Sequence, residues 1–160
     1  MADGGASELV MLVTGLIAAG MVATLLISSW GGLANSVDTA KLEVEVDSRT
    51  RADLISDPVQ ISWNQLSCNL SLFVQNIGDI TLDETSIGII INGTAASVNQ
   101  TRILDNMTSW DIGEVVEINA CPTGVNLVSG QEIFVTLIVQ SVSYNNVVGH
   151  YSFTEVIRLA

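Results

Sequence analysis

The chain has an uninterrupted apolar segment close to its beginning. Leu9 to Ile27 is a run of nineteen residues without a charge, and twelve of them are Leu, Val, Met or Ile. The uncharged run continues as far as Val37. A helix that rises about 1.5 Å per residue crosses a hydrocarbon core of about 30 Å with about 20 such residues. The pattern therefore predicts an α-helix that needs lipid, or a bundle of identical helices, around it.

Small residues recur in this segment at four-residue spacing. They form two series, one of Gly15, Ala19 and Ala23 and the other of Gly20, Thr24 and Ser28. Such spacing lets apolar helices approach closely, which is how they associate when burial from water cannot drive them. We expect helices to pack at Gly15, Ala19, Gly20, Ala23 and Thr24. The alternative is that Gly and Ala are simply frequent in membrane helices.

The pattern beyond Ile27 is mixed. Trp30 followed by Gly31-Gly32 is typical of an interfacial anchor and a flexible joint. A helical spacing continues at Leu33, Val37, Ala40 and Val44, whereas residues 42–46 alternate like a strand. We expect one helix from residue 1 to about 45, its last turns serving as a stalk. A strand near 51–56 should follow, closed by Asp57-Pro58.

Everything after Pro58 reads as β-structure. Apolar alternation predicts strands at 61–63, 68–76, 86–91, 98–104, 115–120, 132–140 and 147–157. Asn92-Gly93 is a hairpin signal, and the strand at 132–140 is apolar on both faces, as a central strand is. Seven or eight short strands favour an antiparallel β-sandwich of immunoglobulin type. The predicted fold is α+β, with a helix and stalk at 1–46 and a sandwich at 47–160.

Composition narrows the classes of function. Hydrophobic residues make up 48 % of the 160 residues and charged residues 14 %, and seventeen acids against five bases give a net charge of -12. Nucleic acid is excluded as a partner because phosphate binding needs clustered Lys and Arg. The single Lys also excludes a basic membrane-surface patch.

Cys68 and Cys121 are the only cysteines, and they belong to separate predicted strands, Cys68 at the start of 68–76 and Cys121 directly after 115–120. They are either two buried free thiols or one disulfide across a loop of about 50 residues. Asn-x-Ser/Thr glycosylation signals favour the disulfide and a location outside the cytoplasm, and they stand at Asn69, Asn92, Asn99 and Asn106.

The segment before the apolar helix bears on processing and orientation. Residues 1–8 carry no Lys or Arg, and no small-residue cleavage site follows Ile27, so we expect a retained anchor. By the positive-inside rule, the C-terminal end of the helix would lie in the cytoplasm, because three cations follow it: Lys41, Arg49 and Arg51. The glycosylation signals indicate the opposite. Since long domains translocate largely regardless of charge, we expect the β domain outside.

The residues capable of chemistry do not assemble into a known active site. His150 is the only histidine, and no nucleophile elbow, zinc helix or phosphate-binding glycine loop accompanies it. Asp79, Asp83 and Glu84 do not have the spacing of a calcium-binding loop, and we expect a solvated acidic turn. Trp63 and Trp110 are either core residues or exposed contacts. We expect neither enzymatic activity nor a cofactor or metal.

Several segments together resemble a known family. The opening GGASELVMLVTGLIAAGMVA, and then SVDTAKLEVEVDSRTRADLISDP, resemble the archaeal flagellum (archaellum) accessory proteins called ArlG, formerly FlaG. In that family an acidic stalk ends in a segment like the one at Arg49 to Pro58. LFVQNIGDITL (72–82), WDIGEVVEI (110–118) and LVSGQEIFVTLIV are similar to its later strands and turns. The resemblance covers nearly the whole chain.

The resemblance implies a stator or anchoring role. The N-terminal helix would sit in the membrane or in a helical bundle, and an immunoglobulin-like domain would stand beneath the S-layer. It also implies assembly into filaments and work with ArlF, a stator protein that contacts S-layer protein. The chain departs from the family in two places. Val-Ser-Gly and Asp-Ile-Gly stand where the family commonly has Pro-Gly turns, and the loop at 92–108 is longer than in the family. Both departures affect the surface that would contact a partner.

Two other classes fit the same plan. An archaellin or type IV pilin-like filament subunit also has a helix and a sandwich, and Glu8 would suit one cut after Gly5, although no Lys or Arg precedes that point. The second alternative is a membrane-anchored adhesin.

Overall fold

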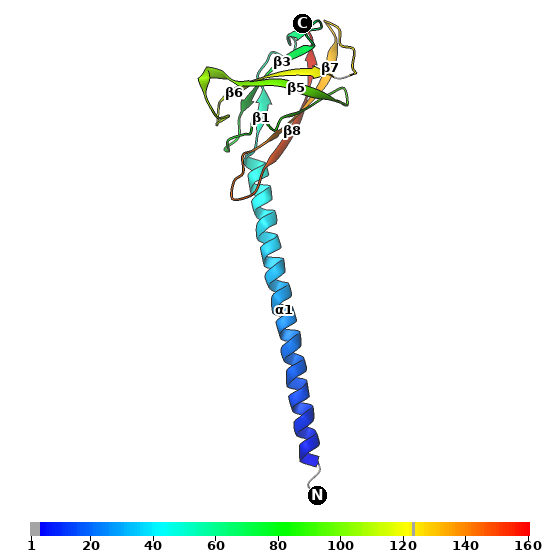
Figure 1. Cartoon of the computed structure of the whole chain (residues 1–160), viewed down its shortest axis with the longest axis vertical. Helices are drawn as coiled ribbons and strands as arrows, with labels where there is room; N and C mark the ends of the chain where they lie inside the picture. The colour runs from blue at the N-terminus through cyan, green and yellow to red at the C-terminus, as the bar shows by residue number, and fades with distance from the viewer. Residues whose placement is uncertain (1–3, 123) are drawn as a thin grey trace. The chain divides into compact units, whose positions relative to one another are not determined.

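The computed structural model describes residues 4–122 and 124–160, and its first element is one long helix. α1 (Gly4–Arg49) runs without interruption for 46 residues (Figure 1). It ends a turn later than the predicted residue 45, and its first predicted residues, 1–3, lie outside the described part. The helix passes through Gly31 and Gly32, so the expected joint is not a break in it. Since no proline occurs before Pro58, nothing in the sequence interrupts the helical hydrogen bonds.

The rest of the chain forms one antiparallel sheet with a short 3₁₀ turn. The elements are β1 (Ala52–Leu54), β2 (Trp63–Asn64), β3 (Asn69–Asn76), β4 (Gly88–Ile91), β5 (Thr94–Ile103), η1 (Leu104–Asn106), β6 (Val115–Pro122), β7 (Glu132–Gln140) and β8 (His150–Arg158). Their order is β1-β3-β6-β5-β4-β7-β8, with β2 also paired to β3. The predicted α+β fold, a long helix followed by an antiparallel sandwich, is confirmed.

Most strands occupy the ranges that the alternation predicts. β7 coincides with the predicted strand at 132–140 and pairs with β4 on one side and β8 on the other, as a central strand does. Its outer face is not fully covered, because Phe134 is 60 % exposed. β5 begins four residues before the predicted 98, because Asn92-Gly93 alone makes the turn and pairing resumes at Thr94.

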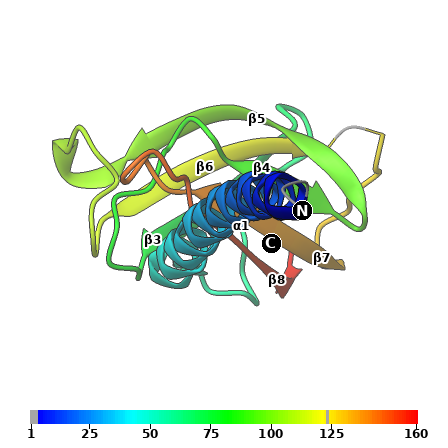
Figure 2. The ribbon, with the colours of Figure 1, turned by 90° about the horizontal axis from the view of Figure 1, so that it is seen from below.

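The sheet closes over its own apolar face. Alternate residues of β3, β6 and β7 point inward and are buried, among them Leu72, Ile118 and Val135. Trp110 is also fully buried and packs in this core. β5 pairs with β4 at its start and with β6 along most of its length, and the register shifts between Val98 and Gln100. Figure 2 shows β5 and β6 side by side along one side of the sandwich.

The chain divides into two compact units, one ending at Lys41 and the other running from Leu42 to Ala160. The second unit, called the β unit below, contains all the strands and the last turns of α1. These turns are held by contacts within the β unit.

Candidate functional site

Up to Ile27, the helix in the first unit of the chain exposes apolar side chains. Leu16, Met21 and Val22 lie on three different sides of α1 and are 69 %, 64 % and 57 % exposed. The helix is long and apolar enough to cross a membrane, by length and composition alone. An apolar surface on every side is typical of a helix that lipid or other helices surround completely.

The predicted helix-packing residues lie on this surface. Gly15, Ala19, Gly20, Ala23 and Thr24 are all exposed. A Cβ atom built on Gly15 or Gly20 would meet no atom within 4 Å. Contacts within the described chain therefore do not account for a glycine at either position. That these residues pack helices stays a prediction.

Hydroxyl groups in the apolar segment bond within the helix. Thr14 Oγ1 donates to the Val10 carbonyl at 2.6 Å, and Thr24 Oγ1 donates to the Met21 carbonyl at 2.8 Å. Each hydroxyl thus uses a carbonyl of the preceding turn. Because an unsatisfied polar group costs several kcal/mol in hydrocarbon, this arrangement suits burial in an apolar environment.

The last turn of α1 is fixed inside the β unit. Val46 and Thr50 are buried, and Thr50 Oγ1 donates to the Val46 carbonyl at 2.8 Å. The loop before β8 packs against them so closely that a Cβ on Gly149 would lie 2.9 Å from both Val46 Cγ1 and the Val46 carbonyl oxygen. The His150 N–H donates to Asp47 Oδ1 at 2.7 Å. Helix and loop therefore form one packed joint.

Two arginines in this region stack on tyrosines. The Arg49 guanidinium carbon is 5.5 Å from the Tyr144 ring centre, and that of Arg51 is 4.7 Å from the Tyr151 ring centre. Both are cation–π distances. Two of the three cations that the positive-inside rule weighed for a cytoplasmic location thus have packing partners in the β unit.

A buried asparagine organises the neighbouring turn, and no local pattern indicates a role for it beyond the turn itself. Asn76 Nδ2 donates to the carbonyls of Ile80 and Trp110 at 2.9 and 3.0 Å, and its Oδ1 accepts from the Gly78 N–H at 3.0 Å. Gly78 passes so close to the end of α1 that a Cβ on it would collide with the Arg49 carbonyl oxygen, and it would lie 2.7 Å from the Arg51 nitrogen just beyond the helix. The only signal in the sequence is Gly78, and the need for a glycine at this position becomes clear only from the fold.

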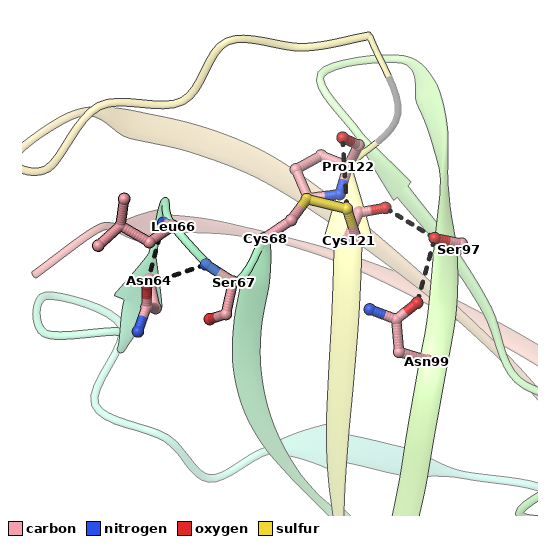
Figure 3. Close-up of a disulfide and its surroundings, with 8 residues drawn as sticks. All are labelled: Asn64, Leu66, Ser67, Cys68, Ser97, Asn99, Cys121 and Pro122. Atoms are coloured by element: carbon pink, nitrogen blue, oxygen red, sulfur yellow. Dashed lines mark hydrogen bonds between the residues drawn. A yellow bond between two sulfur atoms is a disulfide. The ribbon is translucent and has the colours of Figure 1, made fainter.

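Cys68 and Cys121 are joined in a disulfide, with their Cα atoms 5.1 Å apart (Figure 3). The bond connects the start of β3 to the end of β6, strands that already pair antiparallel. Beside it, Ser97 Oγ on β5 donates to the Cys121 carbonyl at 3.2 Å. The disulfide therefore joins two neighbouring strands at one end of the sheet.

The glycosylation signals differ in their surroundings. Asn92 is exposed at the β4–β5 turn, where its Oδ1 accepts from the Phe134 N–H at 2.9 Å. Asn99 is exposed at the register shift of β5, and Asn69 is half-buried at the start of β3. The side chain of Asn106 lies outside the described part. Attachment of sugar at Asn69, Asn92, Asn99 and Asn106 stays a prediction.

Three acidic side chains of the β unit accept hydrogen bonds from hydroxyls, and one of them also pairs with an arginine. The hydroxyls of Thr85 and Ser86 lower the pKa of Asp83, and those of Ser109 and Thr81 lower the pKa of Asp111. Arg102 Nη2 donates to Glu117 at 2.6 Å and lowers its pKa, with Ser71 assisting. Among the described residues, no group of three or more His, Cys, Asp or Glu is placed to hold a metal ion. The carboxylates of Asp83 and Asp111 thus stabilise turns, and that of Glu117 links neighbouring strands.

Both tryptophans of the β unit, which the sequence allowed to be either core residues or exposed contacts, lie against the core. Trp110 is fully buried, and its Nε1 donates to the Glu114 carbonyl at 3.0 Å. Trp63 is partly buried against the core. His150 is exposed at the start of β8, where its backbone rather than its ring makes the contact with Asp47.

Comparison with known proteins finds similarity to a flagella-related protein. No family model matches the chain. The chain is 27 % identical over 131 residues to a protein of Methanocaldococcus jannaschii named "Putative flagella-related protein G", and the match covers 78 % of this chain and 84 % of the relative. This relative carries the name of the family that the sequence resembles, which confirms the resemblance.

A solved structure has the same fold. The chain is similar to a structure described as the archaeal flagellum of Methanospirillum hungatei strain JF1, with a TM-score of 0.63 and 12 % identity. The match covers 98 % of this chain and 93 % of the flagellum chain, so it includes both the long helix and the sheet. At this identity the likeness concerns the fold alone. The chain therefore resembles an archaeal flagella-related protein in sequence and an archaeal flagellum subunit in fold.

Proposed function

We propose that the chain is a structural, non-catalytic component of the archaeal motility apparatus. It is a filament-forming stator or anchor subunit of the ArlG (FlaG) type, held by its N-terminal helix. The flagella-related relative supports this, because its match covers 84 % of that relative. The β domain is of immunoglobulin type and stands outside the cytoplasm, in the cell envelope or on an extracellular filament.

The observation that carries the proposal is the apolar helix. Its large side chains are exposed on every side, from Leu9 at 66 % to Ile27 at 71 %. Exposing so much apolar surface to water is strongly unfavourable at about 25 cal/mol per Å². A membrane, or a core of identical helices, removes that surface from water. In the proposed subunit, the membrane surrounds the helix before assembly and a core of identical helices surrounds it afterwards.

Several features of the β unit support a location outside the cytoplasm. A disulfide persists in oxidising compartments, and the exposed Asn92 and Asn99 are accessible to glycosylation there. Arg49 and Arg51 stack on tyrosines of the β unit, which gives these cations a structural role independent of membrane orientation. Long domains also translocate largely regardless of their charge.

The partners follow from the family resemblance. We propose self-association through α1, contact with an ArlF-like stator protein, and through that protein contact with S-layer protein. The β unit offers exposed apolar side chains for such contacts, including Ile112 at 61 % and Phe134 at 60 %. Its acidic composition disfavours nucleic acid.

The second candidate is an archaellin or type IV pilin-like filament subunit. The specific observation in its favour is the fold likeness to the archaeal flagellum structure over 98 % of this chain. A membrane-anchored adhesin remains the alternative from another class, because a single apolar helix also suits a simple anchor.

Negative-stain electron microscopy of the purified full-length protein tests the proposal. Long uniform filaments are expected for a stator fibre or an archaellin. Particles that stay dispersed and depend on detergent would contradict the filament proposal and favour the adhesin. Peptide mapping of the mature N-terminus then separates the first two: Met1 or Ala2 supports the accessory protein, and Ala6 supports a processed filament subunit.

A further inference from the structure

The apolar surface of α1 changes character after Ile27. From Ser28 to Lys41 the only large apolar residues are Trp30, Leu33 and Val37. They are 69 %, 58 % and 58 % exposed. With Leu26 before them and Ala40 after them, they follow one another at alternating steps of four and three residues.

This alternation places the five residues on one side of the helix. At 3.6 residues per turn, Leu26, Trp30, Leu33, Val37 and Ala40 fall within an arc of about 80°. We call them the Leu26–Ala40 stripe. The other residues of this stretch are small, polar or charged, including Asn35, Asp38 and Lys41. The helix is therefore apolar on every side up to Ile27 and on one side only after it.

The surface of the stripe has the shape of a coiled-coil contact. A hollow on the helix is lined by Leu26, Ser29, Trp30 and Leu33. These are positions i, i+3, i+4 and i+7, the four residues that form the hole for a side chain of the facing helix. The average repeat of 3.5 residues is the period that winds two helices into a left-handed supercoil.

We propose that the Leu26–Ala40 stripe is the contact surface for the same stripe of a second copy, in a parallel, in-register coiled coil. The proposal rests on the proposed function, because anchoring by the same N-terminal helix gives all copies one direction. The period favours a second copy over lipid as the occupant. Lys41 lies beside the stripe, about 20° beyond its edge, and Asp38 lies farther round the helix. A charged side chain is costly in hydrocarbon but normal beside a coiled-coil contact.

The opposite side of the helix supplies a control. Asn35 lies about 160° around the helix from Leu33, at about 100° per residue. Gly31 also lies away from the stripe, and a Cβ on it would meet nothing within 4 Å. Substitutions at Asn35 and Gly31 therefore change the helix without changing the proposed contact.

Single-cysteine cross-linking on the full-length protein tests the proposal. Cys68 and Cys121 are bonded to each other, so an introduced cysteine is the only free thiol. Under mild oxidation, Leu33→Cys should give covalent dimers at least tenfold faster than the matched control Asn35→Cys. Adding Gly31→Ala to the Leu33→Cys variant should leave its rate within twofold. Equal rates at 33 and 35, or a large loss caused by Gly31→Ala, would overturn the stripe as the contact.

Electron microscopy of the same preparations separates this inference from the proposed function. Filaments whose copies cross-link faster at position 35 than at 33 would overturn the stripe and leave the filament proposal standing. A dispersed protein that cross-links at neither position would contradict both. Filaments with preferred cross-linking at position 33 would support both.

Discussion

The backbone N–H of His150 donates to Asp47 Oδ1 over 2.7 Å, across 103 residues of sequence. Asp47 lies in the last turn of α1, and His150 begins β8. Together with buried Val46 and Thr50, this bond makes the end of the helix part of the β unit's packing.

Replacing Asp47 by Ala should lower the free energy of unfolding of the β unit by about 1 kcal/mol. The variant leaves the His150 N–H without its carboxylate acceptor, and a bond to a charged acceptor is worth about 1.5–3 kcal/mol when buried and less at an exposed site. Denaturant unfolding followed by tryptophan fluorescence measures the change. Asp53→Ala is the control, because Asp53 Oδ1 accepts only from the adjacent Leu54 N–H. An equal loss of unfolding free energy in the two variants would show that the bond between Asp47 and His150 does not stabilise the β unit.

Gly149→Ala should destabilise the β unit by about 1–3 kcal/mol, the usual range for overpacking. The new Cβ would meet Thr50 Oγ1 and lie 2.9 Å from the Val46 carbonyl oxygen, and backbone atoms cannot move aside cheaply. Gly88→Ala is the matched control in a strand, because its Cβ would lie 3.4 Å from Ile138, an ordinary contact. Thermal unfolding of both variants gives the comparison. A Gly149→Ala variant as stable as Gly88→Ala would show that the helix end is not tightly packed there.

Removing the disulfide should cost about 4 kcal/mol on the chain-entropy model for a loop of 53 residues. The paired substitution Cys68→Ser with Cys121→Ser avoids a free thiol. The denaturant concentration at the midpoint of unfolding should be the same for this double variant and for the parent protein in reductant. The parent without reductant should have its midpoint at a higher denaturant concentration. Alkylation of the unreduced parent, read by mass spectrometry, provides the covalent check. Any mass increase would contradict a complete bond.

Low pH should reduce the stability that the hydrogen bonds of the Asp111 carboxylate give to its turn. Hydrogen bonds from Ser109 and Thr81 lower its folded-state pKa below the ordinary 3.8, so its contribution to stability is full above that pH and is lost as the pH falls through the lowered value. The double variant Ser109→Ala with Thr81→Val should therefore be less stable than the parent at pH 7. Denaturant midpoints at a series of pH values should show the difference shrinking below about pH 3.8. A difference that grows as the pH falls would have the wrong sign.

The sequence predicted the helix and the strands well because both have strong local signals. The charge-free run from Leu9 to Ile27 and the alternation of β7 each extend over many residues. The start of β5 was missed because residues 94–97 carry weak apolar alternation, and its pairing depends on β4 and β6. Local pattern does not contain that information.

The contacts around the helix end could not be predicted for a related reason. Gly78, Gly149 and Asn76 look like ordinary turn residues, and their roles depend on segments far away in the sequence. The candidate packing residues of α1 could be named because four-residue spacing is local. Their proposed partners could not, since these would lie on another molecule, which the pattern of a single chain does not describe.

Light scattering on the full-length protein carrying Ala19→Glu tests the central claim most directly. A charge at this exposed helix position should abolish high-order assembly, because it would be buried without a partner where helices meet. Ile77→Glu is the control, since it adds the same charge at a side chain 54 % exposed on the β unit. We expect large assemblies for the parent and for Ile77→Glu and none for Ala19→Glu; unchanged assembly of the Ala19→Glu protein would contradict self-association through α1.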